Sequence, residues 1–257
     1  MKTKINSNFK SLTNQELERY NRQILLEEID VHGQSELLEK HVCLIGLGGL
    51  GCPIAYYLAS SGIGKLTIID NDRIDITNLQ RQILFNSSDV NKKKVEVAFK
   101  KLNQLNPTIK INKIDTEINN NTPSAIFKDC DLIIDATDNF KTRTIINKIS
   151  LDNKKPLIMG SAAKMEGQVA VFRNDLPNMP CYNCLYNDLD DKNKSCLDQG
   201  VLASLTGIIG SIQASEAIKL LLRFGETLES KLLLIDVKYS NYRIVNLQQD
   251  KKCKICS

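Results

Sequence analysis

The amino-acid sequence predicts an α/β protein with a Rossmann-like nucleotide-binding fold, in which helices flank a parallel-rich central sheet and an antiparallel extension follows. Short apolar segments alternate with helical patterns over the first 160 residues, which is typical of parallel strands joined by crossover helices. A glycine-rich turn follows the first apolar segment, and an acidic residue ends the second. With 42% hydrophobic and 25% charged residues, the 257-residue chain has the composition of a globular protein.

Apolar runs and helix signals give the order of the elements. The first helix, 13–28, has a capping box, since Thr13 is followed three residues later by Glu16. A second helix follows the glycine turn and ends near residue 60, and a third ends at Asn106-Pro107, where proline stops a helix. The expected later helices cover 140–151 and 203–223. The expected strands are 41–46, 65–70, 109–114, 131–135, 157–159, 168–172, 231–237 and 242–247.

The chain is expected to form one domain over 1–257, with a nucleotide-binding core at 13–165 and a region at 166–257 that binds a metal and a protein partner. The charged run at 188–194 is too poor in apolar groups to pack, so a crossover loop is expected at about 186–200. A net charge of +4 is too small to indicate nucleic acid. The apolar run 201–222 carries charged residues and predicts a buried helix rather than a membrane span. No secretory signal is visible, so we expect a cytoplasmic or organelle-stroma location, where thiols stay reduced.

Eight cysteines give the first specific signal for a site. Cys43, Cys52 and Cys130 lie in apolar or helix-start contexts and are expected to be buried. The pairs Cys181/Cys184 and Cys253/Cys256 each have two residues between the sulfurs, which lets one turn direct both thiolates at one ion. Four sulfur ligands leave no open position, so the pattern predicts a structural Zn²⁺ that staples the C-terminal extension. A redox couple or an incidental pairing is the alternative.

The glycine turn lies between an expected strand and an expected helix, as in dinucleotide-binding proteins. Gly46 allows the tight turn, Gly48 and Gly49 let a phosphate approach the backbone, and Gly51 lets helix and strand pack closely. Asp70 ends the next strand, where an acid can bind ribose hydroxyls. Alone, these features favour a nicotinamide-dependent enzyme, and a turn without a ligand is the other alternative.

The polar residues that follow Asp70 are unusual for a dehydrogenase. Arg81 and Lys94 suit a triphosphate whose negative charge grows during transfer. Asp138, after the fourth strand, suits Mg²⁺ that bridges phosphate oxygens. Taken singly, each residue also fits an ordinary solvated position.

Several motifs occur together and in order, and with them the chain resembles the ThiF/MoeB/HesA family, relatives of ubiquitin-activating enzymes that adenylate small sulfur-carrier proteins. The resemblance covers about residues 13–257. It rests on RYNRQ at 19–23, GLGGLG at 46–51, NLQRQ at 78–82, TDN at 137–139, the two cysteine pairs and GIIGSIQASEAIK at 207–219.

The resemblance implies a role for each matching residue. It implies binding of ATP by Gly46, Gly48, Gly49, Gly51, Asp70, Asn78, Arg81, Gln82, Lys94, Asp138 and Asn139, with Mg²⁺ held by Asp138. Arg22 matches an arginine that the family donates to the neighbouring subunit's ATP site, which implies a homodimer. The four paired cysteines match zinc ligands, and Cys196 matches a cysteine that forms a covalent bond to the carrier in the thiazole branch. Since NKK precedes Lys94 where many members have glycine, the lysine that reaches ATP needs structural evidence.

The activity that the resemblance implies is adenylation of the C-terminal glycine carboxylate of a small ubiquitin-like sulfur-carrier protein. The carrier would be of the MoaD type (molybdenum cofactor) or the ThiS type (thiamine thiazole), with pyrophosphate as the second product. No rhodanese-like domain follows, so a separate sulfur donor is expected. The alternatives are an NAD-dependent oxidoreductase and a non-catalytic zinc scaffold that binds ubiquitin-like proteins.

Overall fold

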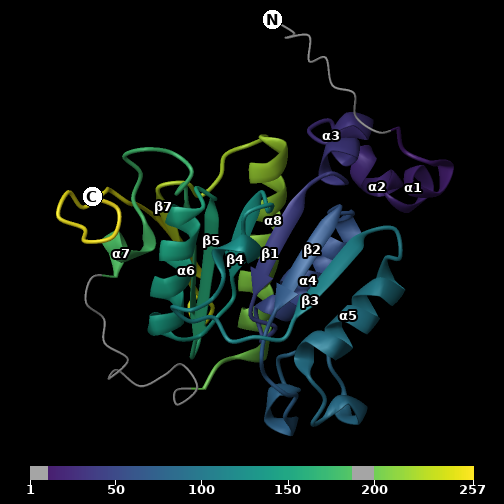
Figure 1. The fold of residues 1–257 in the computed structure, drawn as a ribbon, viewed down its shortest axis with the longest axis horizontal. Helices are drawn as coiled ribbons and strands as arrows, with labels where there is room; N and C mark the ends of the chain where they lie inside the picture. The colour runs from purple at the N-terminus through teal and green to yellow at the C-terminus, as the bar shows by residue number, and fades with distance from the viewer. Residues whose placement is uncertain (1–10, 187–199) are drawn as a thin grey trace, which may run out of the picture.

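The computed structural model describes residues 11–186 and 200–257, and it forms a three-layer α/β sandwich (Figure 1). Its sheet has the strand order β3-β2-β1-β4-β5-β6-β7-β8. The first five strands are parallel and the last three are antiparallel. The strands are β1 (His41–Ile45), β2 (Lys65–Ile69), β3 (Lys110–Ile114), β4 (Leu132–Asp135), β5 (Leu157–Ala163), β6 (Glu166–Phe172), β7 (Lys231–Asp236) and β8 (Asn241–Asn246). The predicted parallel core with an antiparallel extension is confirmed.

Helices cover both faces of this sheet. One face packs against α4 (Gly51–Ser61), α5 (Lys94–Leu105) and α8 (Ala203–Leu222), and the other against α6 (Phe140–Asp152) and α7 (Tyr182–Leu185). Three short helices, α1 (Asn14–Arg19), α2 (Asn21–Ile24) and α3 (Asp30–Leu37), lie together beyond the end of the sheet at which β1 begins (Figure 1). Single 3₁₀ turns are η1 (Ile76–Asn78), η2 (Ser87–Asp89) and η3 (Ser124–Ile126). The division of the domain at residue 165 stays a prediction.

The predicted single helix over 13–28 is wrong, although its capping box is confirmed. Thr13 Oγ1 accepts the backbone N–H of Glu16 at 3.2 Å, and the Glu16 carboxylate accepts that of Thr13 at 2.8 Å. The helix breaks at Tyr20, whose side chain is buried and bonds to Asn106 and Thr108 beside α5. Packing of this tyrosine therefore overrides a helical pattern that continues on both sides of it. Helix α3 was not predicted from the sequence.

Strand β5 is longer than the predicted 157–159. Leu157–Ala163 pairs antiparallel with Glu166–Phe172 along its whole length, and Lys164 turns the hairpin with a φ of 53°. Its second half, from Gly160 to Ala163, is made of glycine, serine and alanine, which carry little strand propensity. The partner strand, not local sequence, therefore extends β5.

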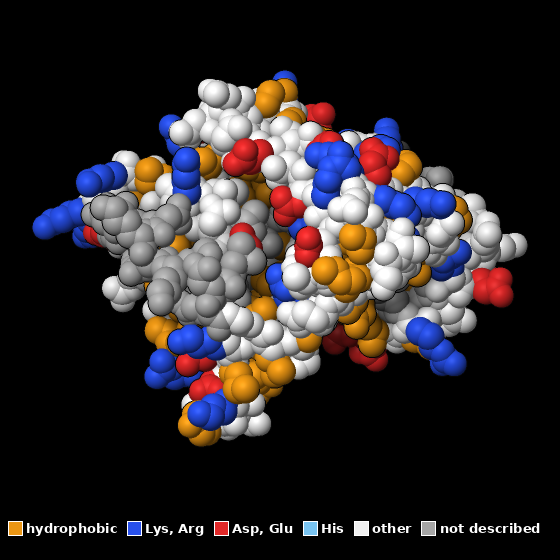
Figure 2. Space-filling view, turned by 90° about the horizontal axis from the view of Figure 1, so that it is seen from below, with side chains coloured by type: hydrophobic (Ala, Val, Ile, Leu, Met, Phe, Trp, Pro, Cys, Tyr) orange, Lys and Arg blue, Asp and Glu red, His pale blue; other side chains and the backbone are white. Residues whose placement is uncertain are grey.

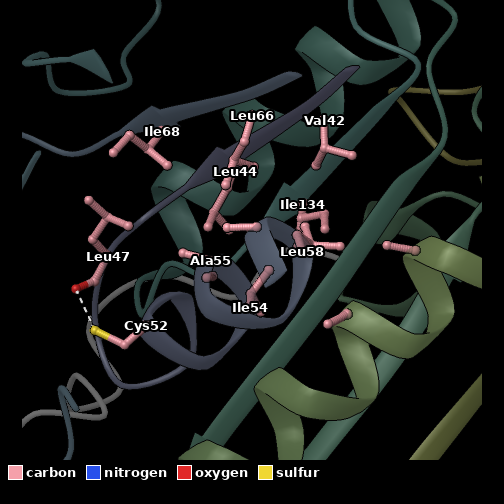
Figure 3. Close-up of a cluster of buried hydrophobic side chains, with 14 of the residues drawn as sticks. Val42, Leu44, Leu47, Cys52, Ile54, Ala55, Leu58, Leu66, Ile68 and Ile134 are labelled. Atoms are coloured by element: carbon pink, nitrogen blue, oxygen red, sulfur yellow. Dashed lines mark hydrogen bonds between the residues drawn. The ribbon is translucent and has the colours of Figure 1, made fainter. Parts of the chain in front are cut away.

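The core beneath α4 joins three adjacent strands. Val42 and Leu44 of β1, with Leu66 and Ile134 from the neighbouring strands, pack against α4 through residues that include Leu58 (Figure 3). Cys52 is fully buried at the start of α4 and donates its thiol to the Leu47 carbonyl at 3.5 Å. Cys43 and Cys130 are buried as well, as predicted.

Helix α8 is long and apolar enough to cross a membrane, judged by length and composition alone. It packs instead against β5, β6 and α4, and buries the polar residues Gln213 and Glu216. Glu216 accepts the backbone N–H of Leu228 at 2.7 Å, and Gln213 donates to the Asp135 carbonyl at 3.0 Å. These contacts are those of a core helix.

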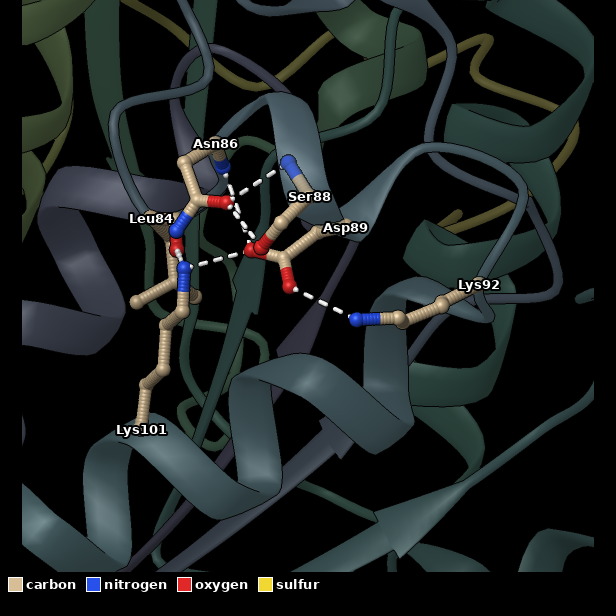
Figure 4. Close-up of polar contacts among 6 residues, drawn as sticks. All are labelled: Leu84, Asn86, Ser88, Asp89, Lys92 and Lys101. Carbon is tan, nitrogen blue, oxygen red and sulfur yellow. Dashed lines mark hydrogen bonds and ion pairs between the residues drawn. The ribbon is translucent and has the colours of Figure 1, made fainter.

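The segment between β2 and α5 is fastened to α5 by one buried carboxylate. Asp89 accepts bonds from Lys101 at 2.6 Å, from Lys92 at 3.3 Å and from the backbone N–H of Asn86 at 3.1 Å (Figure 4). Burial by itself raises the pKa of Asp89, but these donors outweigh it, so the pKa is lowered overall. Lys101 also donates to the Leu84 carbonyl at 2.8 Å, which ties the segment to the helix a second time.

We expect Asp89→Asn to lower the free energy of unfolding at pH 7 by about 1.5–3 kcal/mol, the range for hydrogen bonds to a charged group. A carboxylate with a depressed folded pKa stabilises above its unfolded pKa, about 3.9, and the gain is lost as pH falls through the folded pKa. The difference between wild type and variant in urea unfolding should therefore shrink below about pH 4. The control is Asp115→Asn, which breaks the half-exposed Lys93–Asp115 pair and should cost less than about 1 kcal/mol. An Asp89 variant no less stable than this control would contradict the prediction.

Candidate nucleotide site and cysteine cluster

A cavity of about 500 Å³ opens at the carboxyl ends of the parallel strands. It lies where the strand order reverses, between β1 and β4, which is the switch point at which open α/β sheets bind ligands. Figure 2 views this end of the molecule and shows the hollow with acidic and basic side chains around it. The cavity is therefore in the expected position for a charged ligand.

Nearly all of the predicted nucleotide-binding residues line this one cavity. They are Gly46, Gly48, Gly49, Asp70, Asn78, Arg81, Gln82, Lys94, Asp138 and Asn139. Gly51 lies just behind the lining, at the start of α4. Arg22 does not line the cavity, and Cys196, with nearly all of the predicted crossover loop 186–200, lies outside the described residues.

The glycine turn brings the start of α4 directly against the end of β1. A Cβ on Gly51 would lie 1.9 Å from the Gly46 carbonyl oxygen, so any side chain there would push the helix away from the turn. Gly46 has a φ of 91°, and a Cβ there would lie 2.9 Å from the Ala136 carbonyl oxygen. The turn therefore requires glycine at both positions for close packing.

Asp70 fixes the glycine turn from the side of β2. Its carboxylate accepts the backbone N–H of Leu47 at 2.7 Å and that of Asp72 at 2.8 Å. Burial raises the pKa of Asp70, and the nearby Lys94 ammonium and the two backbone donors oppose that shift. The carboxylate stays in the cavity wall, where one lone pair of each oxygen is left for a further donor.

Of three consecutive lysines, only Lys94 lines the cavity. Its side chain is 5% exposed and its ammonium bonds to Asp72 at 2.8 Å. Lys92 pairs instead with Asp89, and Lys93 with Asp115. Of the three lysines, Lys94 is therefore the one that can contact a ligand in the cavity.

The segment at 76–82 presents an amide and a guanidinium to the cavity. Asn78 closes η1, where its side-chain oxygen accepts the backbone N–H of Asp75 at 3.2 Å. Arg81 is half-buried and donates to the Thr77 carbonyl at 3.2 Å. Gln82 is 3% exposed, and its buried Oε1 has no hydrogen-bond partner in the described part of the chain. Such an atom in a cavity wall is suited to receive a donor from a ligand.

The turn between β4 and α6 presents a free carboxylate. Asp138 is exposed, and it makes no hydrogen bond or ion pair to any residue that the structure describes. The next residue, Asn139, caps α6, since its side-chain oxygen accepts the backbone N–H of Thr142 at 2.8 Å. The Asp138 carboxylate is therefore available to a cation, whereas that of Asp72 already faces Lys94.

Several residues that line the cavity were not predicted from the sequence, among them Arg143, Glu117 and Thr206. Arg143 is 4% exposed and donates to the carbonyls of Thr137 and Gly160. An arginine in a helix usually reads as a solvated position, so nothing in the local sequence distinguished it. Thr206, on α8, lies where a Cβ on Gly49 would meet it at 3.0 Å.

The four paired cysteines come together in one cluster away from the cavity, with all sulfur atoms within 4.8 Å of one another. Cys181 lies 3.8 Å from Cys253, and Cys184 lies 3.4 Å from Cys256. A tetrahedral ion with sulfur at about 2.3 Å requires sulfur–sulfur distances of about 3.8 Å, so the geometry fits such an ion. The cluster also contacts α6, because Asn147 bonds to the backbone N–H of Tyr182 and to the side chain of Asn183.

Arg22 lies at the opposite end of the sheet from the cavity. It belongs to α2, in the group of short helices beyond the start of β1, whereas the glycine turn follows the end of β1 (Figure 1). Its side chain is exposed. Arg22 therefore cannot reach the cavity of its own chain.

The fold and the cavity define an α/β protein with a charged site at its switch point, and comparisons identify the family. The sequence profile of the ThiF family matches residues 20–255, so the chain belongs to the ThiF family. It is 40% identical over 245 residues to the molybdopterin-synthase adenylyltransferase of Salmonella typhimurium, covering 95% of this chain and 98% of that protein. It is 39% identical over 238 residues to the sulfur carrier protein ThiS adenylyltransferase of Escherichia coli, covering 93% and 94%. A crystal structure of E. coli MccB with ATP superposes with a TM-score of 0.82 at 26% identity, covering 97% of this chain and 75% of that one.

Proposed function

We propose that this protein uses ATP to adenylate the C-terminal glycine carboxylate of a small ubiquitin-like sulfur-carrier protein, releasing pyrophosphate. The observation that carries the proposal is one cavity that joins the glycine turn, Asp70, two cations and a free carboxylate at the switch point of the sheet. The full-length relatives are named as adenylyltransferases of molybdopterin synthase and of ThiS, which supports the same reaction for molybdenum cofactor or thiamine biosynthesis. Sulfur would come from a separate donor.

The proposed reaction requires the site to bring two anions together, the carrier carboxylate and ATP. The carrier carboxylate attacks the α-phosphorus of ATP, so no strong general base is needed, and the work is positioning and electrostatic stabilisation. Asp70 would accept the ribose hydroxyls, and Asn78 would donate its amide to phosphate oxygens. Arg81 and Lys94 would offset the charge that develops on the leaving pyrophosphate.

The residues present fit a magnesium ion. Asp138 offers an exposed carboxylate in the cavity wall that bonds to no other described residue, and carboxylate oxygens are preferred ligands of Mg²⁺. Held there by Asp138, Mg²⁺ would offset part of the negative charge of the triphosphate. An NAD-dependent oxidoreductase would need the glycine turn and Asp70, but it would leave Arg81 and Lys94 without a role.

We also propose a homodimer in which Arg22 completes the ATP site of the partner. Arg22 cannot reach its own cavity, and two apolar residues beside it, Leu25 and Leu26, are 67% and 51% exposed. Exposed leucines beside a functional cation are typical of an interface. In a two-fold dimer each chain would give one arginine and receive one.

The carrier would dock on the antiparallel part of the sheet. Strand β8 is exposed along its whole length and pairs only with β7 in the described structure. Tyr242 and Ile244, 57% exposed each, lie on one face of it and offer apolar surface. A carrier seated there would lie on the region that includes the β5–β6 hairpin, whose Ala162 lines the cavity.

For the cysteine cluster we propose a structural zinc ion held by Cys181, Cys184, Cys253 and Cys256. The support is the tetrahedral spacing of the sulfurs and the absence of an open coordination position. The ion would hold the C-terminal segment against the turn that contains α7. A location in the cytoplasm or an organelle stroma, where thiols stay reduced, is part of the proposal.

We expect Arg81→Ala and Asp138→Ala each to lower ATP–pyrophosphate exchange by about a hundredfold or more, because each removes charge that acts mainly in the transition state. The assay contains the purified carrier, MoaD-type and ThiS-type in turn, which also identifies the pathway. The matched control is Lys92→Ala, beside Lys94 but outside the cavity, which should keep near-wild-type exchange. Near-wild-type exchange in both site variants would refute the proposed site.

Mixing two inactive variants tests the shared site. Arg22→Ala and Lys94→Ala should each be inactive alone, because each removes one cation from every site. After subunit exchange, half of the dimers are mixed and each has one intact site, so about a quarter of wild-type activity should return. If Arg22 acts within its own chain, each mixed dimer has one site that lacks Arg22 and one site that lacks Lys94. No activity then returns.

Purified protein should contain about one zinc ion per chain by elemental analysis. Cys253→Ser should lower the zinc content and the thermal midpoint, since binding energy at a structural site contributes to folding. Cys52→Ala removes a buried thiol outside the cluster and should leave the zinc content unchanged. Full zinc content in Cys253→Ser would show that the four cysteines do not bind the ion together.

A further inference from the structure

Thr137, the residue before Asp138, is held from two sides by buried charged groups. One carboxylate oxygen of Asp135 accepts the backbone N–H of Thr137 at 2.8 Å and its hydroxyl at 2.7 Å. From the other side, the Arg143 guanidinium donates to the Thr137 carbonyl through Nε at 3.2 Å and Nη2 at 2.5 Å. Every backbone polar group of this residue, and its hydroxyl, is therefore occupied by one of two side chains.

Both side chains are themselves anchored to other parts of the fold. Asp135 is 1% exposed, and its backbone carbonyl accepts the Gln213 amide of α8 at 3.0 Å. Arg143 is 4% exposed, and Nη2 also donates to the Gly160 carbonyl of β5 at 3.2 Å. The turn after β4 is thus tied to α6, α8 and β5 at once.

Burying Asp135 and Arg143 in this arrangement is unfavourable for the stability of the fold. Arg143 has no carboxylate within 4 Å among the residues that the structure describes, and the second oxygen of Asp135 has no hydrogen-bond partner there. Burial raises the pKa of Asp135, and the nearby Arg143 guanidinium and the two Thr137 donors offset only part of that shift. Removing charges from water without a direct ion pair costs several kcal/mol. Uncharged groups could stabilise this turn without the free-energy cost of burying two charges. The two buried charges therefore indicate a functional reason.

The Asp138 side chain has no such anchors. It makes no bond to a described residue, so the position of its carboxylate depends on the backbone on either side of it. On the far side the backbone enters α6 through the Asn139 cap. On the near side, the hydrogen bonds from Asp135 and Arg143 hold the backbone of Thr137, the residue next to Asp138.

We propose that Asp135, Thr137 and Arg143 form a clamp that holds the Asp138 carboxylate in the direction required to bind the metal–ATP complex. Asp135 and Arg143 are positioning residues, because they act through the backbone of Thr137. This inference rests on the proposed function, since it explains how that site is kept ready. A planar guanidinium reaches two carbonyls from one side chain, which the point charge of lysine cannot reproduce.

The test uses Arg143→Lys, which keeps the charge and loses the fork, and Thr137→Val, which removes only the hydroxyl bond to Asp135. Binding of Mn²⁺ to the ATP complex of the full-length protein is measured by electron paramagnetic resonance, together with the Mg²⁺ dependence of pyrophosphate exchange. We expect Arg143→Lys to weaken Mn²⁺ binding by roughly 10–100-fold, the usual effect of removing a group that orients a metal ligand. Thr137→Val should show a smaller loss in the same direction. Higher Mg²⁺ should restore the exchange rate in both.

The control is Arg173→Lys, in which the altered arginine binds Asp175 and Glu229 away from the cavity. It should lose some stability and bind Mn²⁺ normally, which separates a structural effect from a positioning effect. Unchanged Mn²⁺ affinity in both Arg143→Lys and Thr137→Val overturns the clamp, and so does an exchange rate that high Mg²⁺ does not restore. If Arg143→Lys does not fold, Thr137→Val decides alone.

The clamp and the proposed function fail in different ways. If Asp138→Ala also binds Mn²⁺–ATP and exchanges pyrophosphate normally, the site itself is misassigned. If Asp138→Ala is inactive while the two clamp variants are normal, the site stands and only the clamp is wrong.

Discussion

The contact between Gly51 and Gly46 is the constraint on which the rest of the site depends. Without a side chain at residue 51, the first turn of α4 lies against Gly46, the first residue after β1. The free N–H groups at the start of a helix then face the carboxyl ends of the strands, where a bound anion is stabilised. Asp70 holds the same turn from β2, and the clamp on Thr137 orders the neighbouring turn from β4. Three strand ends are thus fixed around one cavity.

Much of this was predictable from the sequence because strong local signals and tertiary structure agree there. The apolar strands, the glycine turn and the ends of α5 and α6 all follow rules that depend on a few adjacent residues. The two cysteine pairs illustrate a longer reach. Their spacing within each pair is local, whereas their meeting across 72 residues was predicted only from the four-sulfur ligand set that the proposed ion would need.

What the sequence did not reveal depends on distant partners. Tyr20 interrupts the first helix because it packs on residues near the end of α5, and β5 is extended by pairing with β6. Arg143 can be recognised as a site residue only in the folded structure, where its guanidinium donates to the Thr137 carbonyl. The choice of Lys94 among three lysines is of the same kind, since the turn of chain before α5 points each of them toward a different neighbour.

Helix α6 joins the two halves of the molecule that carry chemistry. Its first turn lines the nucleotide cavity through Thr142 and Arg143, and about one turn later Asn147 bonds to the segment between Cys181 and Cys184. The cysteine cluster and the nucleotide cavity therefore share one helix, and the position of α6 sets part of the geometry of both.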